Sequence, residues 1–187
     1  MWKGVQQTRR GLHAEGKMTM TLAKLSPRKG GGLNFIGNLV KVRMSADDGN
    51  DGISILEHRM AKGEAPPLHI HRHEDEIFHL MEGCMRFEVD GKTIVAESGD
   101  TVLAPKGIPH RFIVESIPHR FIVESEEGAR CLTIMTGHDF GSLVRDISPV
   151  FDSEDLPPAV APTPAMIEKL VAAAAQNNID IVGPPLA

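Results

Sequence analysis

Four side chains of this 187-residue chain have the types and the spacing of ligands for one metal ion. Three of them fall in the glycine-bounded segment 63–83, and the fourth ends a second segment that runs from Gly99 through a Pro-Lys-Gly turn. The four candidates are His69, His71, Glu76 and His110. Three neutral imidazoles and one carboxylate form a mixed nitrogen and oxygen ligand set, which suits iron, manganese, nickel, copper or zinc. The sequence therefore predicts a mononuclear transition-metal centre.

The spacing of these residues favours strands over helices. His69 and His71 are two positions apart, so on a β-strand both imidazoles project from the same face. On a helix the two rings would lie about 200° apart and could not bind the same ion. A second strand-like run begins at Glu76, and alternation places this carboxylate on one face with Phe78 and Leu80. A Pro-Lys-Gly turn then brings the fourth candidate in from a different strand.

The surrounding segments are typical of a mainly β protein. Short runs rich in branched and aromatic residues alternate with turn clusters, and Asp90-Gly91 is a strong signal for a tight hairpin. The strand-like runs are 35–42, 53–58, 69–71, 76–81, 86–89, 92–95 and 131–134. Several short strands separated by turns predict a sandwich or a jelly-roll barrel.

The two segments resemble the paired motifs of the cupin superfamily. The resemblance covers residues 34–147 and implies a single cupin double-stranded β-helix, or jelly-roll barrel. The first motif fits throughout, and the second fits through His110, although Val114 stands where the family often has Asn. Residue by residue, the family's metal ligands fall on the four candidates named above.

Further details of the sequence indicate a branch of this superfamily. Fifteen residues separate Gly83 from Gly99, a separation similar to that of small bacterial single-domain cupins. The runs 66–71, 74–76 and 183–186 look like the quercetin-dioxygenase-like branch. That resemblance implies a dioxygenase-type oxidoreductase acting on a small phenolic or enolisable compound. Iron, manganese or nickel is the favoured metal, with zinc, cobalt or copper as alternatives, and the resemblance also implies a homodimer.

The chemistry of such a site leaves several functions open. Four protein ligands on an octahedral ion leave two positions for water, substrate or O₂, and Glu76 could take a proton from a bound hydroxyl or enediol. The alternatives to a dioxygenase are a redox-neutral metal-dependent isomerase, lyase or hydrolase and a non-catalytic small-ligand-binding cupin, because a fold does not determine function. The candidate substrate-pocket residues are Phe78, Leu80, Arg86 and Phe112. Arg86 could bind an anionic substrate, or it could lie on a solvated strand face.

Three segments are expected along the chain: a flexible basic N-terminal leader at 1–32, the barrel at 33–150, and a linker with a C-terminal helix at 151–187. The leader has seven Lys or Arg residues and one Glu, a net charge of +6, so the remainder carries −11 of the total of −5. It lacks a nucleic-acid-binding motif, and we interpret it as a leader or as an over-extended start before Met18 or Met20.

The C-terminal segment and the composition complete the expectations. Thr163 predicts the N-cap of a helix that begins at Pro164 and packs on the barrel or on a partner subunit. No apolar run approaches the roughly 20 residues that span a bilayer, so no membrane association is expected. There is no apolar N-terminal segment, and the two cysteines fit buried reduced thiols, which favours a cytoplasmic location.

A tandem repeat interrupts the second motif. Residues 108–116 recur without change as residues 117–125. Because nine is odd, one continuous strand would present the second copy's side chains to the opposite face, and Pro118 lacks the N–H that a central strand needs. One copy should therefore be displaced from the barrel. We favour His110 as the fourth ligand, with His119 in a loop or added hairpin, and His119 is the alternative fourth ligand.

Overall fold

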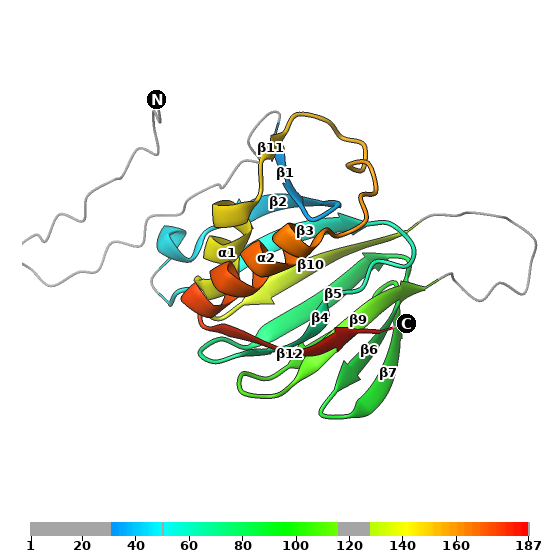
Figure 1. Ribbon diagram of the computed structural model, residues 1–187. Coiled ribbons are helices and arrows are strands. Elements are labelled where there is room, and N and C mark those ends of the chain that lie inside the picture. Colours follow the sequence, from blue (N-terminus) through cyan, green and yellow to red (C-terminus); the bar gives the residue numbers. More distant parts are fainter. Residues whose placement is uncertain (1–30, 50, 116–127, 187) are drawn as a thin grey trace, which may run out of the picture.

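The computed structural model describes residues 31–49, 51–115 and 128–186, and in these residues two antiparallel sheets pack against each other (Figure 1). The predicted leader, apart from its last residues, and the second copy of the repeat, including His119, lie outside the described residues. The expectation of a mainly β fold with a C-terminal helix is confirmed.

The larger sheet has the strand order β11-β1-β2-β3-β10-β5-β8. Its strands are β1 Gly32–Phe35, β2 Asn38–Met44, β3 Ser54–Met60, β5 Glu76–Glu82, β8 Thr101–Ala104, β10 Ala129–Met135 and β11 Val150–Phe151. The smaller sheet has the order β12-β4-β9-β6-β7. Its strands are β4 Pro67–His71, β6 Cys84–Val89, β7 Lys92–Glu97, β9 His110–Glu115 and β12 Ile179–Pro185.

The core lies between the sheets and follows from strand alternation. On β5, Glu76, Phe78 and Leu80 are buried, whereas the residues between them are half-buried. Phe78 packs against Phe87 and Phe112, with ring centroids 5.0 and 5.6 Å away. The predicted hairpin is also present, because β6 and β7 pair across Asp90 and Gly91, both of which have positive φ.

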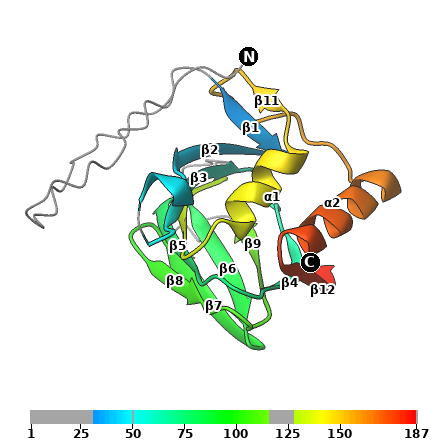
Figure 2. The ribbon, with the colours of Figure 1, turned by 90° about the vertical axis from the view of Figure 1, so that its left-hand side faces the viewer.

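Helices cover one side of the strands (Figure 2). They are the short 3₁₀ helix η1 Ala46–Asp48, α1 Asp139–Ile147 and α2 Pro164–Gln176. As predicted, the Thr163 side chain caps α2 by accepting a hydrogen bond from the Met166 N–H. Leu143 of α1 and Ala174 of α2 share a buried cluster with Ile179 of β12, so the C-terminal helix packs on the barrel's own chain. No helix in the described residues is long and apolar enough to cross a membrane.

Two elements near the site were not predicted from the sequence. Helix α1 contains a glycine, which weakens the helical signal. Strand β12 follows a turn at Asn178, which has a φ of 57°, and pairs with β4. It contains Pro184 and Pro185, residues that argue against a strand unless the strand lies at a sheet edge, where β12 does lie.

Candidate metal centre

The four predicted ligands come together from both sheets. His69 and His71 project from β4, and His110 opens β9, where it lies opposite His69 in the β4–β9 pair. Glu76 opens β5 in the other sheet, flanked by β8 and β10. One ligand atom from each side chain lies within 4.8 Å of every other. The structure thus brings together all four residues that the motif spacing predicted.

The three imidazoles face one carboxylate oxygen. The Nε2 atoms of His110, His71 and His69 lie 2.9, 3.4 and 3.9 Å from Glu76 Oε2. His71, Glu76 and His110 are buried, and the His69 side chain is 12% exposed. The cluster is therefore closed on most sides and reached next to His69.

The opposite nitrogen of each imidazole is fixed by an acceptor. His69 Nδ1 lies 2.8 Å from the Pro67 carbonyl oxygen, and His110 Nδ1 lies 2.9 Å from that of Ile108. His71 Nδ1 lies 2.9 Å from Glu74 Oε1. Because carbonyl and carboxylate oxygens only accept hydrogen bonds, Nδ1 carries the proton in each neutral ring and Nε2 presents its lone pair.

This tautomer pattern tests whether the site suits a cation. A bare Nε2 and a carboxylate oxygen are both acceptors, so their contact at 2.9 Å is stabilised by a metal cation between them or by a second proton on His110 that donates to Glu76. The Nε2 of His71 is buried without any hydrogen-bond partner. Three lone pairs and one carboxylate, held by outer hydrogen bonds, are the donor set of a divalent transition-metal ion. The residues present fit a metal.

For Glu76 and His71, the neighbouring charges and burial shift the pKa in opposite directions. Burial alone would raise the pKa of Glu76, but His71, His110 and His69 hold it well below its usual value. Burial lowers the pKa of His69. It would also lower that of His71, but the charges and hydrogen bonds of Glu76 and Glu74 outweigh burial and raise the pKa. The cluster therefore stabilises positive charge at its centre.

An apolar cavity of about 420 Å³ opens beside the cluster. His69, His71 and Glu76 line it, and aromatic rings form much of the adjoining wall. The lining rings are Phe35, Phe78, Phe112 and Phe140. Side chains from α2 and the preceding linker that line the cavity and remain exposed, such as Val160 and Ile167, mark its entrance.

Comparison with known proteins identifies the fold. The cupin domain family model matches residues 56–135, which contain all four candidate ligands. Residues 56–135 of this protein are a cupin domain. The prediction of a cupin from the two motifs is thereby confirmed.

Individual relatives cover parts of the cupin. A quercetin 2,3-dioxygenase from Bacillus subtilis is 34% identical over 55 residues, which are 29% of this chain and 16% of that protein. KdgF from Halomonas sp. has a similar structure, with a TM-score of 0.44, 15% identity, and coverage of 53% of this chain and 77% of the other. A cupin 2 conserved barrel domain protein from Leptotrichia buccalis gives a TM-score of 0.41 at 20% identity, covering 52% of this chain and 39% of that protein.

Of the four pocket residues predicted for the cupin, the structure brings two to the cavity. Phe78 and Phe112 line it, whereas Leu80 is fully buried in the core and does not. Arg86 does not line it either, because its Nε donates to Glu115 Oε1 at 2.6 Å on the neighbouring strand. The predicted anion-binding role of Arg86 has no support in this geometry.

Glu74 is a functional candidate that the sequence reading missed. It is fully buried next to His71. Its carboxylate accepts one hydrogen bond from the Nδ1–H of His71 and two from the backbone N–H groups of Asp139 and Phe140. These are the first two residues of α1, where the helix dipole favours negative charge. Gly137 leaves room for the carboxylate, because a Cβ there would lie 2.6 Å from Glu74 Oε2. The i, i+3 spacing from His71 was the available signal.

His58 is a second residue whose position was not foreseen. It lies on β3, lines the cavity, and stacks on Phe140 with a centroid distance of 5.8 Å and an interplanar angle of 14°. Burial lowers its pKa to about 4, against the opposing charges of Glu76 and Glu57. It is therefore a neutral imidazole inside the cupin cavity.

Proposed function

We propose that this cupin is a mononuclear metal-dependent oxidoreductase of the dioxygenase type, acting on a small neutral phenolic or enolisable compound. The observation that carries the proposal is the direct opening of the four-residue cluster into an apolar, ring-lined cavity of about 420 Å³. This volume suits a small aromatic ligand. The partial match to a quercetin 2,3-dioxygenase is in keeping with it.

The cluster would hold one iron, manganese or nickel ion through His69, His71, Glu76 and His110, and the bound metal would supply Lewis acidity and one-electron chemistry with O₂. Glu76 turns Oε2 toward the three imidazoles, which leaves Oε1 to accept a proton from a substrate hydroxyl. The outer hydrogen bonds keep the imidazoles in place while the proton moves. The apolar walls exclude water from the reacting atoms.

The cavity also constrains the charge of the substrate. Among the described residues, no lysine or arginine lines it, whereas two carboxylates, Glu64 and Glu76, do. An anionic substrate such as a sugar phosphate would therefore lack a fixed cationic partner in the wall. Phe78, Phe112 and Phe140 offer faces and edges for an aromatic ring.

The decisive experiment loads the metal-free protein with one metal at a time, measures metal content, and follows O₂ uptake with a panel of neutral phenols. We expect about one ion per chain, and O₂ uptake with iron, manganese or nickel that is lost in Glu76→Ala together with the metal. Product formation without O₂ uptake would support a redox-neutral isomerase or lyase instead. Stoichiometric binding without any product, with every metal, would support a small-ligand-binding cupin.

We further propose that the cupin is a cytoplasmic homodimer. The edge strands β7 and β8 carry exposed apolar side chains, Val95 at 54% and Leu103 at 52% exposure, and covering a sheet edge with a second subunit prevents open-ended pairing. Both cysteines, Cys84 and Cys131, are buried and unpaired, as in proteins kept in a reducing compartment.

A further inference from the structure

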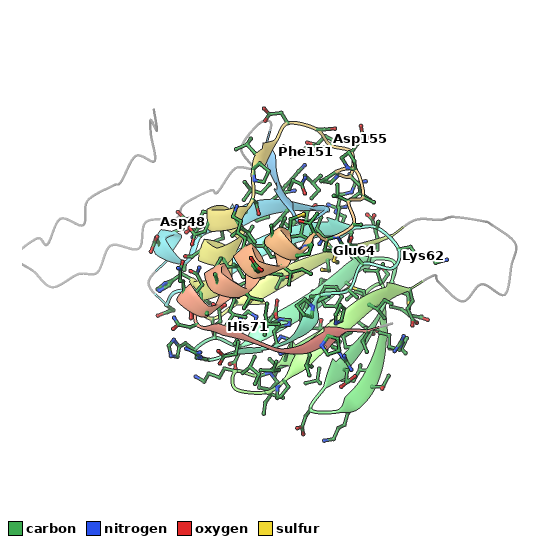
Figure 3. All side chains as sticks on the ribbon, viewed as in Figure 1. Asp48, Lys62, Glu64, His71, Phe151 and Asp155 are labelled. Carbon is green, nitrogen blue, oxygen red and sulfur yellow. The ribbon has the colours of Figure 1, made fainter. Side chains whose placement is uncertain are left out.

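The cupin cavity has a second polar region in addition to the candidate metal ligands. Asn38 at the start of β2, His58 on β3, and Glu64 in the connection from β3 to β4 all line it. Figure 3 shows Glu64 separated from His71, whereas His58 lies nearer the ligand cluster, since His58 and His71 both pack against Phe140. Polar side chains placed in an otherwise apolar wall usually fix the orientation of a ligand.

Unsatisfied atoms in this region point to a missing partner. In the described residues, four buried side-chain polar atoms have no hydrogen-bond partner: Asn38 Oδ1, His58 Nε2, His71 Nε2 and Ser148 Oγ. Three of the four belong to residues that line this one cavity. The His71 atom is explained by a metal. Because buried polar atoms are almost always paired in folded proteins, with protein groups, water or a ligand, the atoms of Asn38 and His58 are free to bind a group that enters the cavity.

The local geometry holds these groups in place. Val40 lies opposite His58 in the β2–β3 pair, so Asn38, two residues before Val40, is a diagonal neighbour of His58 on the same face. Burial raises the pKa of Glu64, and a hydrogen bond from the Asn38 side chain partly offsets this. That bond uses the amide N–H of Asn38 and leaves Oδ1 free. The Glu64 carbonyl accepts from the Val114 N–H at 3.0 Å, which ties this region to ligand strand β9.

We propose that Asn38, His58 and Glu64 form a second hydrogen-bonding subsite, which binds a hydroxyl group of the substrate other than the one that faces the metal. Asn38 Oδ1 and the Glu64 carboxylate are acceptors, so the group they bind is a donor, and an anionic group is repelled by Glu64. The ligand class is a neutral aromatic compound with hydroxyl groups at both ends and its rings among Phe78, Phe112 and Phe140. The identity of the group at the metal end rests on the proposed function, whereas the subsite itself does not.

The test measures binding rather than turnover. Isothermal titration of the full chain, both metal-free and loaded with redox-inert Zn²⁺, compares phenol with hydroquinone and para-phenylphenol with para,para′-dihydroxybiphenyl. In the wild type, the second hydroxyl should lower the Kd about tenfold in the pair whose length spans the cavity, as one added hydrogen bond to buried acceptors predicts. In His58→Phe and in Asn38→Leu, the ratio of the two Kd values should fall to within about twofold.

A matched control separates the subsite from a general effect of losing a histidine. His79→Phe removes a histidine whose Nδ1 lies 3.0 Å from Thr101 Oγ1 and which does not line the cavity, so this variant should keep the wild-type ratio. If His58→Phe does not fold, as judged by circular dichroism, the test relies on Asn38→Leu. Asn38 is only half-buried, so its substitution disturbs the core less. The subsite is refuted if neither pair shows a gain in the wild type, or if the gain survives in both variants. Absence of O₂ uptake with the discrimination intact would refute the dioxygenase proposal and leave the subsite standing.

Discussion

Replacing Glu74 by glutamine tests how the cupin fold orients its candidate metal ligands. The substitution keeps the size of the side chain but removes its charge and turns one acceptor oxygen into an NH₂ donor. Glu74 accepts three hydrogen bonds, one from His71 Nδ1 at 2.9 Å and two from the N–H groups of Asp139 and Phe140 at 3.2 and 2.8 Å. A glutamine can satisfy only part of this set, because its NH₂ group faces a donor whichever way it is turned.

The expected size of the effect follows from two independent estimates. A buried hydrogen bond to a charged group contributes about 1.5–3 kcal/mol. Loss of an outer hydrogen bond to a metal-ligating histidine typically lowers metal affinity about 10–100-fold, which corresponds to about 1.4–2.8 kcal/mol. We therefore expect Glu74→Gln to raise the Kd for Zn²⁺ or Ni²⁺ by about one to two orders of magnitude, without abolishing binding.

Competition against a chromophoric chelator measures this Kd, and thermal unfolding of the metal-free variant shows whether it is folded. Glu97→Gln is the matched control, since Glu97 is exposed on β7 and should bind metal as the wild type does. A folded Glu74→Gln protein with a Kd within about twofold of the wild type would refute the orienting role. A complete loss of binding, equal to that of Glu76→Ala, would instead show that the site does not bind metal without this hydrogen bond.

Three further outcomes follow from the structure. Metal affinity should fall as the pH is lowered, because the carboxylates near His71 outweigh burial and raise its pKa, so a proton competes for Nε2 from a pH above the usual value of about 6.5. Affinity that stays constant between pH 8 and pH 6 in chelator competition would contradict this. His110→Ala should remove the fourth ligand, whereas His119→Ala, or deletion of residues 117–125, should leave metal content near normal; the reverse pattern would place the second copy in the barrel. Multi-angle light scattering should report a dimer at micromolar concentration, and a monomer would contradict the proposed assembly.

The ligand set could be predicted from the sequence because part of its geometry is local and the rest follows from the resemblance of two glycine-bounded motifs to a known family. Strand alternation puts His69 and His71 on one face whatever the rest of the chain does, and the glycine-bounded turns set the positions of Glu76 and His110. The same alternation placed Phe78 correctly in the cavity wall. Residues placed by strand alternation or by the two motifs could therefore be predicted from the sequence.

The residues that were missed depend on contacts distant in sequence. Glu74 is defined by the N-terminus of α1, more than 60 residues away, and that helix was itself hidden by Gly141. His58 is defined by Phe140 on the same helix and by the cavity that the two sheets enclose. Arg86 shows the converse error, since its partner Glu115 lies 29 residues along the chain and takes it out of the pocket. Periodicity assigns a face to a side chain but does not supply its partner.

His58 also links the proposed function to stability. A buried polar atom without a partner costs about 1–3 kcal/mol, and no protein group in the described residues pairs with the Nε2 of His58. Phenylalanine removes this atom and keeps the stacking on Phe140, and the adjacent cavity has room for its larger ring. We therefore expect His58→Phe to raise the free energy of unfolding by about 1 kcal/mol, and the melting temperature by about 2–4 °C, while weakening the binding of the dihydroxy probe.

This opposite movement of stability and binding is the signature of a residue retained for a ligand. Urea unfolding of the metal-free protein measures the first quantity, and titration with the dihydroxy probe measures the second. His79→Phe serves again as the control, because it loses a satisfied hydrogen bond to Thr101 and should not gain stability. If His58→Phe is less stable than the wild type by 1 kcal/mol or more, the imidazole makes a favourable contact in the empty protein. The unpartnered Nε2 of His58 would then no longer be evidence for a bound substrate hydroxyl.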